Sequence, residues 1–184
     1  MMEDLAMHIL EILMNSIGAN ATKIILRIKE SLKDDMIDIE VIDDGKGMSE
    51  EMVKKVTDPF TTSRKTRKVG MGVAFMKGLT EQCDGHFGIV SELGKGTTVR
   101  SSVRRSHIDV PPLGDLGQMM MYAVQADENI DFEFDYITDT DKFIFRSSEI
   151  KEQLDGVSIL EPEILIWVKN YINENISNIR EEMR

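Results

Sequence analysis

One stretch of the sequence combines residue types that can bind a flat, hydrogen-bonding ligand. The apolar run from Ile37 to Ile42 is followed by Asp43-Asp44-Gly45-Lys46-Gly47-Met48. Alternating β-branched residues favour a strand, and two glycines one residue apart end it in a tight loop with an accessible main chain. A carboxylate at the strand end can accept a hydrogen bond from an amino group, but aspartate and glycine are also ordinary turn residues. The stretch therefore predicts either a ligand-binding loop or a plain strand-to-helix turn.

A second group of polar residues lies on the predicted first helix, from Glu3 to Ile17. Its apolar residues recur at helical spacing, and His8, Glu11 and Asn15 follow one another three and four residues apart on another face. Glu11 and Asn15 are therefore neighbours that could point at one ligand. The alternative is an ordinary solvated helix face, with His8 as a packing or surface residue.

A third group is basic and leads into two glycines. Residues 60–69 contain Thr61, Thr62 and four cations, among them Lys65, and they precede Gly70-Met71-Gly72 at the start of an apolar helix. Exposed amides and a helix N-terminus attract anions, and lysine or arginine neutralises them. The segment is thus suited to a polyphosphate, and the alternative is a solvated loop.

These residues must be positioned by the elements around them. Residues 24–28 and 37–42 alternate as a hairpin, and Gly94-Lys-Gly96-Thr97 forms a turn before a strand. Pro111-Pro112 marks a linker within residues 104–112. The further predicted helices span 49–58, 72–82, 113–126, 148–154 and 162–183, and the further predicted strands span 86–91, 97–103, 130–137 and 143–145.

Composition narrows the functional class. The chain of 184 residues has a single cysteine, Cys83, which excludes an intrachain disulfide and a cysteine-based metal cluster. No apolar run is long enough to cross a bilayer, so we expect a cytoplasmic protein.

The charge is distributed unevenly along the chain. Residues 107–184 carry 17 acidic and 6 basic residues, whereas residues 1–106 carry 16 of each, so the net charge of −11 lies in the C-terminal part. An acidic surface argues against nucleic acid or an anionic membrane as its partner.

Four short motifs in this order resemble a known nucleotide-binding domain. They are Glu11-x-x-x-Asn15, Asp43-x-Gly45-x-Gly47, the basic segment ending in Gly70-x-Gly72, and Gly94-x-Gly96-Thr97. The set resembles the GHKL domain that DNA gyrase B, heat-shock chaperones of that class, sensor histidine kinases and MutL proteins share, and it covers about residues 5–104. Residues 15–22 look like the MutL version, whereas residues 59–63 and 94–98 look like histidine-kinase versions.

The resemblance implies a role for each matching residue. Asn15 would bind Mg²⁺ shared with the phosphates of ATP, and Asp43 would accept a hydrogen bond from the adenine amino group, directly or through water. Gly45, Gly47 and Met48 would line the base pocket, and Thr97 would complete the base contact. The predicted lid over the phosphates spans residues 61–72 and includes Thr61, Thr62, Lys65, Gly70, Met71 and Gly72.

Glu11 bears on the type of reaction. A carboxylate one helical turn before the metal-binding asparagine could deprotonate a water or a protein hydroxyl that attacks the γ-phosphate. Histidine kinases of this class usually carry asparagine there, so Glu11 points to an ATPase or a serine-kinase-like enzyme. Two positions differ from the family patterns. Gly18 stands where the MutL pattern has an acidic residue, three positions after the asparagine, and Lys68 stands where the lid motif often has its first glycine. The chain also shows no helical hairpin with a phosphorylatable histidine, so we do not expect a self-contained two-component sensor.

The expected fold for residues 1–105 is a two-layer α/β sandwich of the Bergerat type, with a mixed, largely antiparallel sheet covered on one face by helices. Residues 106–184 are predicted to form a small acidic α+β region that serves as a partner-interaction or dimerisation module. The predicted function is Mg²⁺-dependent ATP binding with slow hydrolysis or phosphotransfer in a regulatory role. Two alternatives stay open: a nucleotide-gated interaction protein without significant catalysis, and an anti-sigma-like serine kinase.

Overall fold

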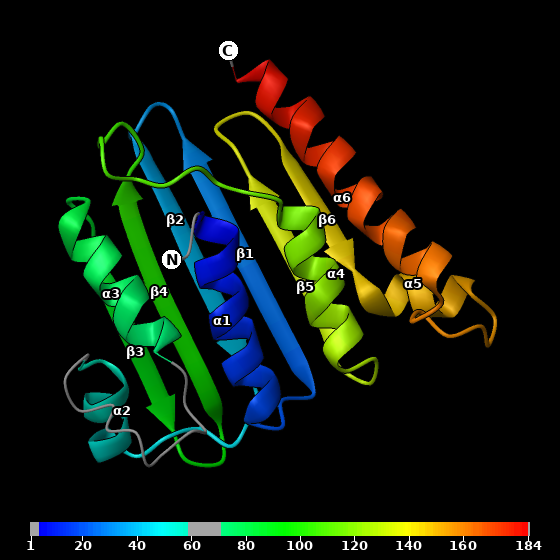
Figure 1. The fold of residues 1–184 in the computed structure, drawn as a ribbon, viewed down its shortest axis with the longest axis horizontal. Coiled ribbons are helices and arrows are strands. Elements are labelled where there is room, and N and C mark those ends of the chain that lie inside the picture. Colours follow the sequence, from blue (N-terminus) through cyan, green and yellow to red (C-terminus); the bar gives the residue numbers. More distant parts are fainter. Residues whose placement is uncertain (1–3, 59–70, 184) are drawn as a thin grey trace.

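The computed structural model describes residues 4–58 and 71–183 (Figure 1). Within them every helix and strand expected from the sequence is present, with ends that differ by a few residues. The fourth helix, for example, begins at Leu116 rather than Leu113, because the Asp115 side chain caps it by accepting from the Gln118 N–H. The elements are α1 (Leu5–Gly18), β1 (Lys23–Ser31), β2 (Met36–Asp43), α2 (Glu50–Val56), α3 (Gly72–Gln82), β3 (Phe87–Glu92), β4 (Gly96–Arg104), α4 (Leu116–Ala126), β5 (Asp131–Ile137), β6 (Lys142–Arg146), α5 (Ser147–Gln153) and α6 (Pro162–Glu182).

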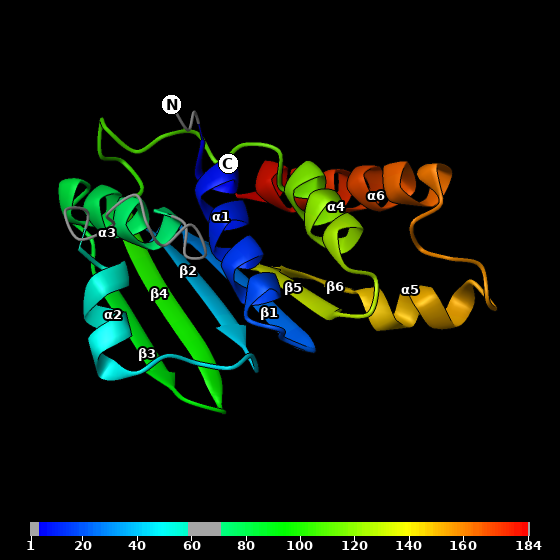
Figure 2. The same ribbon diagram turned by 60° about the horizontal axis from the view of Figure 1, so that its bottom comes forward.

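The strands form one six-stranded sheet in the order β3-β4-β2-β1-β5-β6. Neighbouring strands are antiparallel except β1 and β5, which are parallel. Helices α1, α3, α4 and α6 lie over one face of this sheet (Figures 1 and 2). The predicted two-layer sandwich with a mixed, mostly antiparallel sheet is therefore confirmed.

The core lies between this helical layer and the sheet, and the residue pattern of each element explains why. In β1, Ile24, Leu26 and Ile28 alternate with more exposed residues, so all three side chains point to the helical face. On α1, Leu5, Ile9, Ile12 and Leu13 recur at helical spacing and are buried against them. The same periodicity turns the opposite side of α1 away from the core.

The C-terminal region continues the sheet rather than standing apart from it. Strand β5 lies directly beside β1, where Phe132, Phe134 and Tyr136 are in register with Ile24, Leu26 and Ile28. Helices α4 and α6 pack on each other, and α4 also packs on α1. The two regions predicted from the sequence thus share one sheet and one hydrophobic core, while the boundary at residue 105 stays a prediction.

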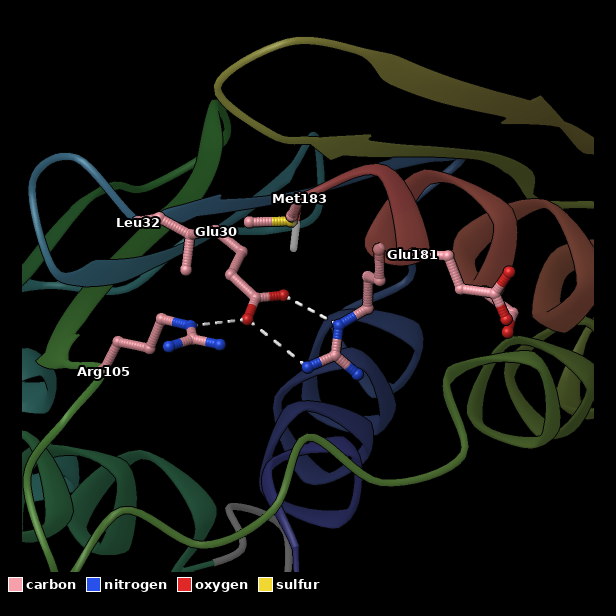
Figure 3. Close-up of a pocket in the computed structure, with 7 residues that line it drawn as sticks. Glu30, Leu32, Arg105, Glu181 and Met183 are labelled. Atoms are coloured by element: carbon pink, nitrogen blue, oxygen red, sulfur yellow. Dashed lines mark hydrogen bonds and ion pairs between the residues drawn. The ribbon is translucent and has the colours of Figure 1, made fainter.

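A buried carboxylate ties four segments together at one end of β1, and Figure 3 shows its contacts with Arg105 and with α6. Glu30 is only 2% exposed; it accepts from Arg105 Nε at 2.8 Å and from Arg180 Nε at 2.9 Å, and it also accepts from the Tyr136 hydroxyl. Burial alone would raise the pKa of Glu30, but these donors outweigh it and hold the pKa below its ordinary value. The contacts join β1, the linker, β5 and α6 beside a cavity of about 310 Å³.

Candidate functional site

The loop after β2 is built around the Asp43 carboxylate. Asp43 is the last residue of β2, lies opposite Thr97 of β4, and is 8% exposed. Ser16 Oγ of α1 donates to its Oδ2 at 2.6 Å, and the Gly45 N–H donates to its Oδ1 at 2.9 Å. A buried carboxylate needs such donors, and here they also fix the direction of its remaining lone pairs. Asp43 is therefore a preorganised hydrogen-bond acceptor.

The adjacent Asp44 faces away from this site. Its carboxylate accepts from the Thr22 and Lys23 N–H groups at 2.7 and 2.9 Å and from the Thr22 hydroxyl. Burial alone would raise the pKa of Asp44, but the hydrogen bonds from Lys23 and Thr22 together outweigh it and lower the pKa. Two consecutive aspartates thus have different roles, and Asp44 holds the start of β1.

Each glycine of the loop meets main chain or side chains at close range. Gly47 has φ +65°, and a Cβ there would lie 1.9 Å from the Glu92 carbonyl oxygen. A Cβ on Gly45 would lie 2.9 Å from the Ala19 Cβ. The loop is therefore held between the end of α1 and the β3–β4 turn. Gly47 lines the neighbouring cavity, whereas Gly45 is not among the cavity residues.

This loop forms one wall of a cavity of about 80 Å³. Five of the residues singled out in the sequence meet there: Asn15, Asp43, Gly47, Met48 and Thr97. Most of the other cavity residues are apolar or present main chain: Ile12, Ser16, Gly18, Ala19, Lys46, Val73, Ile89 and Val99. Apolar walls with a few converging polar groups suit a flat heteroaromatic ring.

Glu11 and the start of α3 lie together near this cavity. Glu11 is one turn before Asn15 on α1 and is partly buried, but it does not line the cavity. A Cβ on Gly72 would lie 2.6 Å from the Glu11 Cβ, so the first turn of α3 packs directly on the Glu11 side chain. Met71, at the N-cap position of α3, is exposed and makes no side-chain capping bond. The other predicted lid residues, Thr61, Thr62, Lys65 and Gly70, lie outside the described residues.

Comparison with known proteins identifies the family. Residues 3–107 match the sequence profile of the family described as "Histidine kinase-, DNA gyrase B-, and HSP90-like ATPase". The chain belongs to this family. The match includes Glu11, Asn15, the Asp43 loop and Thr97, and the predicted GHKL resemblance is confirmed.

Two bacterial proteins are similar to parts of the chain. The anti-sigma F factor of Caldanaerobacter subterraneus subsp. tengcongensis is 39% identical over 77 residues, which are 41% of this chain and 50% of that protein. The sensor kinase CckA of Brucella abortus is 32% identical over 84 residues, which are 45% of this chain and 9% of that protein. The chain thus matches half or less of the length of these relatives.

A solved structure shares the fold over a larger part of the chain. The N-terminal domain of a DNA repair protein superposes with a TM-score of 0.54 at 18% identity, over 78% of this chain and 52% of the other. At this identity the likeness shows the fold alone. Among the described residues of this family member, no helix has both the length and the hydropathy that crossing a membrane requires.

Two serines that contact the candidate site residues were not singled out in the sequence. Ser16 orients Asp43, and it was hidden because it follows Asn15 on a helix whose buried stripe reads as apolar core. Ser91 Oγ accepts from the Met48 N–H at 2.8 Å and lies 2.8 Å from Thr97 Oγ1. The signal for Ser91 is strand pairing, because it lies opposite Thr97 in the β3–β4 ladder.

The residues present fit a magnesium ion that is shared with a substrate. Among the described residues, no group of three or more His, Cys, Asp or Glu side chains could hold a metal ion by itself. Mg²⁺ commonly keeps one or two protein oxygens and takes its other ligands from water and phosphate. Asn15 lines the cavity, and its side-chain amide carries an oxygen of the type that such a shared Mg²⁺ can accept as a ligand.

Proposed function

We propose that this chain binds ATP with Mg²⁺ in the cavity between α1, the Asp43 loop and β4. The observation that carries the proposal is the Asp43 carboxylate, which is buried and oriented by Ser16 and Gly45 where it can accept from an exocyclic amino group. Thr97 and Ser91 lie beside it as further polar groups. Family membership supports this reading, since the matched family is one of ATPases.

The phosphates would extend from the cavity toward Asn15 and the start of α3. Asn15 would hold Mg²⁺, which supplies charge neutralisation when bound, and the N–H groups at the first turn of α3 suit phosphate oxygens. Lys65 and the other lid residues are proposed to cover them. Gly45 and Gly47 keep the loop close to α1 and to the β3–β4 turn, and the base is proposed to lie against Gly47 and Met48, which line the cavity.

Glu11 is proposed as the general base. A water or protein hydroxyl would attack the γ-phosphorus, its proton would pass to the Glu11 carboxylate, and the bond to the ADP oxygen would break. The support is that Glu11 lies one turn from Asn15, the proposed metal ligand, and packs against Gly72 of the proposed lid. The reaction is hydrolysis when water attacks and phosphotransfer when a protein hydroxyl attacks.

A serine-kinase activity is a second candidate. Its support is the similarity to an anti-sigma F factor, which is 39% identical over 77 residues. In a third reading, ATP binding orders the lid so that a protein partner docks on the acidic C-terminal region, without turnover. Phosphorylation of a partner protein on serine separates the second reading from ATP hydrolysis, and persistent binding without turnover favours the third.

Thermal denaturation with and without Mg-ATP tests the proposed site. A ligand at a hundred times its Kd stabilises the folded state by about 2.7 kcal/mol, which raises the Tm of a chain of this size by about 5–10 °C. We expect this shift for the wild type and for Asp44→Asn, whose carboxylate faces away from the cavity. Asp43→Asn should lose most of it. An unshifted wild type, or an equal shift in Asp43→Asn, would contradict the proposal.

A further inference from the structure

The outer edge of β6 has main-chain groups that no described strand satisfies. Strand β6 is the last in the sheet order and pairs only with β5. The Thr138 N–H donates to the Asp141 carbonyl at 2.8 Å, and bonded and non-bonded pairs alternate along an antiparallel ladder. Phe143 and Phe145 are therefore bonded to β5. The alternate residues, whose N–H and C=O groups point away from β5, are Lys142, Ile144 and Arg146.

Aromatic side chains of β6 and α6 form a row beside this edge, and the outermost ring is exposed to solvent. Helix α6 lies over β6 at the outer end of the helical layer (Figures 1 and 2). Phe143 of β6 meets the Tyr171 ring edge to face with centroids 5.5 Å apart, and Tyr171 stacks on Trp167 at 4.9 Å. Trp167 is 47% exposed. A tryptophan that stacks on a neighbouring ring but stays exposed beside an open strand edge offers a contact for a chain that pairs with the edge.

The charge on the face of α6 that carries Trp167 is negative, whereas Lys142 and Arg146 of β6 alternate with Phe143 and Phe145 and lie on the opposite face of the sheet. Exposed Glu163 and Glu174 lie four residues before and seven residues after Trp167, so all three share one face of α6. Residues 107–184 as a whole carry 17 acidic and 6 basic residues. A cationic side chain above Trp167 would gain both a cation–π contact and attraction to the two glutamates. A second copy would bring the same negative charge, which disfavours self-association here.

We propose that the β6 edge surface, meaning the main-chain edge of Lys142–Arg146 with Trp167, Tyr171, Glu163 and Glu174, binds an extended basic segment of another protein. The segment adds to the sheet as a further strand through main-chain hydrogen bonds to Ile144 and its neighbours. Its alternate side chains face α6, where lysine or arginine contacts Trp167 and the glutamates. This surface is separate from the nucleotide cavity and does not depend on it.

Fluorescence anisotropy with a labelled alternating Lys-Val octapeptide tests this surface on the full chain. The controls are an alternating Glu-Val peptide and a Lys-Val peptide whose amides are N-methylated, which keeps the charge but cannot pair with a strand. We expect the unmodified basic peptide to bind at least about tenfold more tightly than either control, with an affinity that falls as salt rises.

Three variants locate the binding. Ile144→Pro removes an outward N–H without breaking the ladder to β5, and Trp167→Ala removes the exposed ring. Each should weaken peptide binding by about tenfold or more. Ile166→Ala, which truncates a neighbouring residue that is 56% exposed, should change it by less than about twofold. If circular dichroism shows that Ile144→Pro does not fold, the binding measured with Trp167→Ala and with the methylated peptide still tests the proposal.

Several results would overturn the proposal. One is that the basic peptide does not bind, and another is that the methylated peptide binds equally well, which would mean that charge alone is recognised. Equal effects of Trp167→Ala and Ile166→Ala would remove the aromatic row from the surface. A concentration-dependent dimer that Ile144→Pro abolishes would assign the edge to a second copy of the chain.

Discussion

At the scale of single residues, the site depends on which hydrogen bonds each side chain receives. Asp43 and Asp44 are the same residue type in consecutive positions, yet only Asp43 lines the cavity, because Asp44 is bonded by Thr22 and Lys23. The sequence predicted Asp43 from its place at a strand end before two glycines. It did not reveal Ser16, because a serine within a buried helical stripe has no sequence pattern that separates packing from orientation of a carboxylate.

Glu11→Ala tests the proposed general base at this scale. The variant should retain the Tm increase with Mg-ATP, because Glu11 does not line the cavity, while phosphate release should fall by about 10²- to 10⁴-fold. Turnover is measured as released phosphate in single-turnover and steady-state assays. Glu50→Ala, at the exposed start of α2, serves as the control and should keep wild-type turnover. Unchanged turnover in Glu11→Ala would remove Glu11 from the mechanism.

At the scale of elements, α1 and α3 come into close contact at Gly72, where a larger residue would meet the Glu11 side chain. The sequence predicted both helices from their apolar spacing and predicted a glycine-rich start for α3. It could not show that Gly72 packs on Glu11, because the contact joins residues far apart in the chain whose meeting depends on the whole helical layer. Gly72 therefore has a packing reason in addition to its proposed place in the lid.

Gly72→Ala should disturb the site through this contact. Its added Cβ would lie 2.6 Å from the Glu11 Cβ, so α3 or the Glu11 side chain must shift, at a cost of about 1–3 kcal/mol in the free energy of unfolding. Phosphate release should fall more than Mg-ATP binding does. Gly78→Ala is the matched control on the same helix, because nothing lies within 4 Å of its added Cβ. It should stabilise the protein by about 0.5–1 kcal/mol in urea unfolding, and equal behaviour of the two variants would refute the contact.

At the scale of the whole molecule, one sheet joins the family domain to the acidic C-terminal region. Hydrophobic alternation predicted β5 and β6 as strands, whereas the two-layer sandwich was expected from the resemblance to the GHKL family. It did not predict that β5 lies parallel to β1, because a central strand has two edges and the residue pattern does not say which strand fills each. Charge asymmetry suggested two regions, yet the surface charge of a region does not report where its strands pair.

Glu30→Gln tests how strongly this joint contributes to stability. The folded state lowers the pKa of Glu30, so its carboxylate stabilises the protein above the ordinary glutamate pKa, and that contribution is lost as pH falls through the folded-state value. At pH 7 the variant should lose about 1–3 kcal/mol in urea unfolding, because Tyr136 and two arginines lose a charged partner.

The difference between Glu30→Gln and the wild type should shrink as pH falls below about 4.3. Exposed Glu152→Gln is the control and should change stability by less than about 0.5 kcal/mol at either pH. A difference that stays constant down to pH 3 would mean that packing of the side chain, and not its charge, holds α6 and the linker to β1.

The parallel pairing of β1 with β5 also bears on how the chain is made. On the ribosome β1 emerges early, whereas β5 is translated more than a hundred residues later, after β2, β3 and β4. During that interval the antiparallel half of the sheet can form, but one side of β1 has no strand beside it and is open to pairing with another nascent chain. A strand that is translated after the antiparallel half of the sheet therefore covers the open side of β1 and protects it from aggregation.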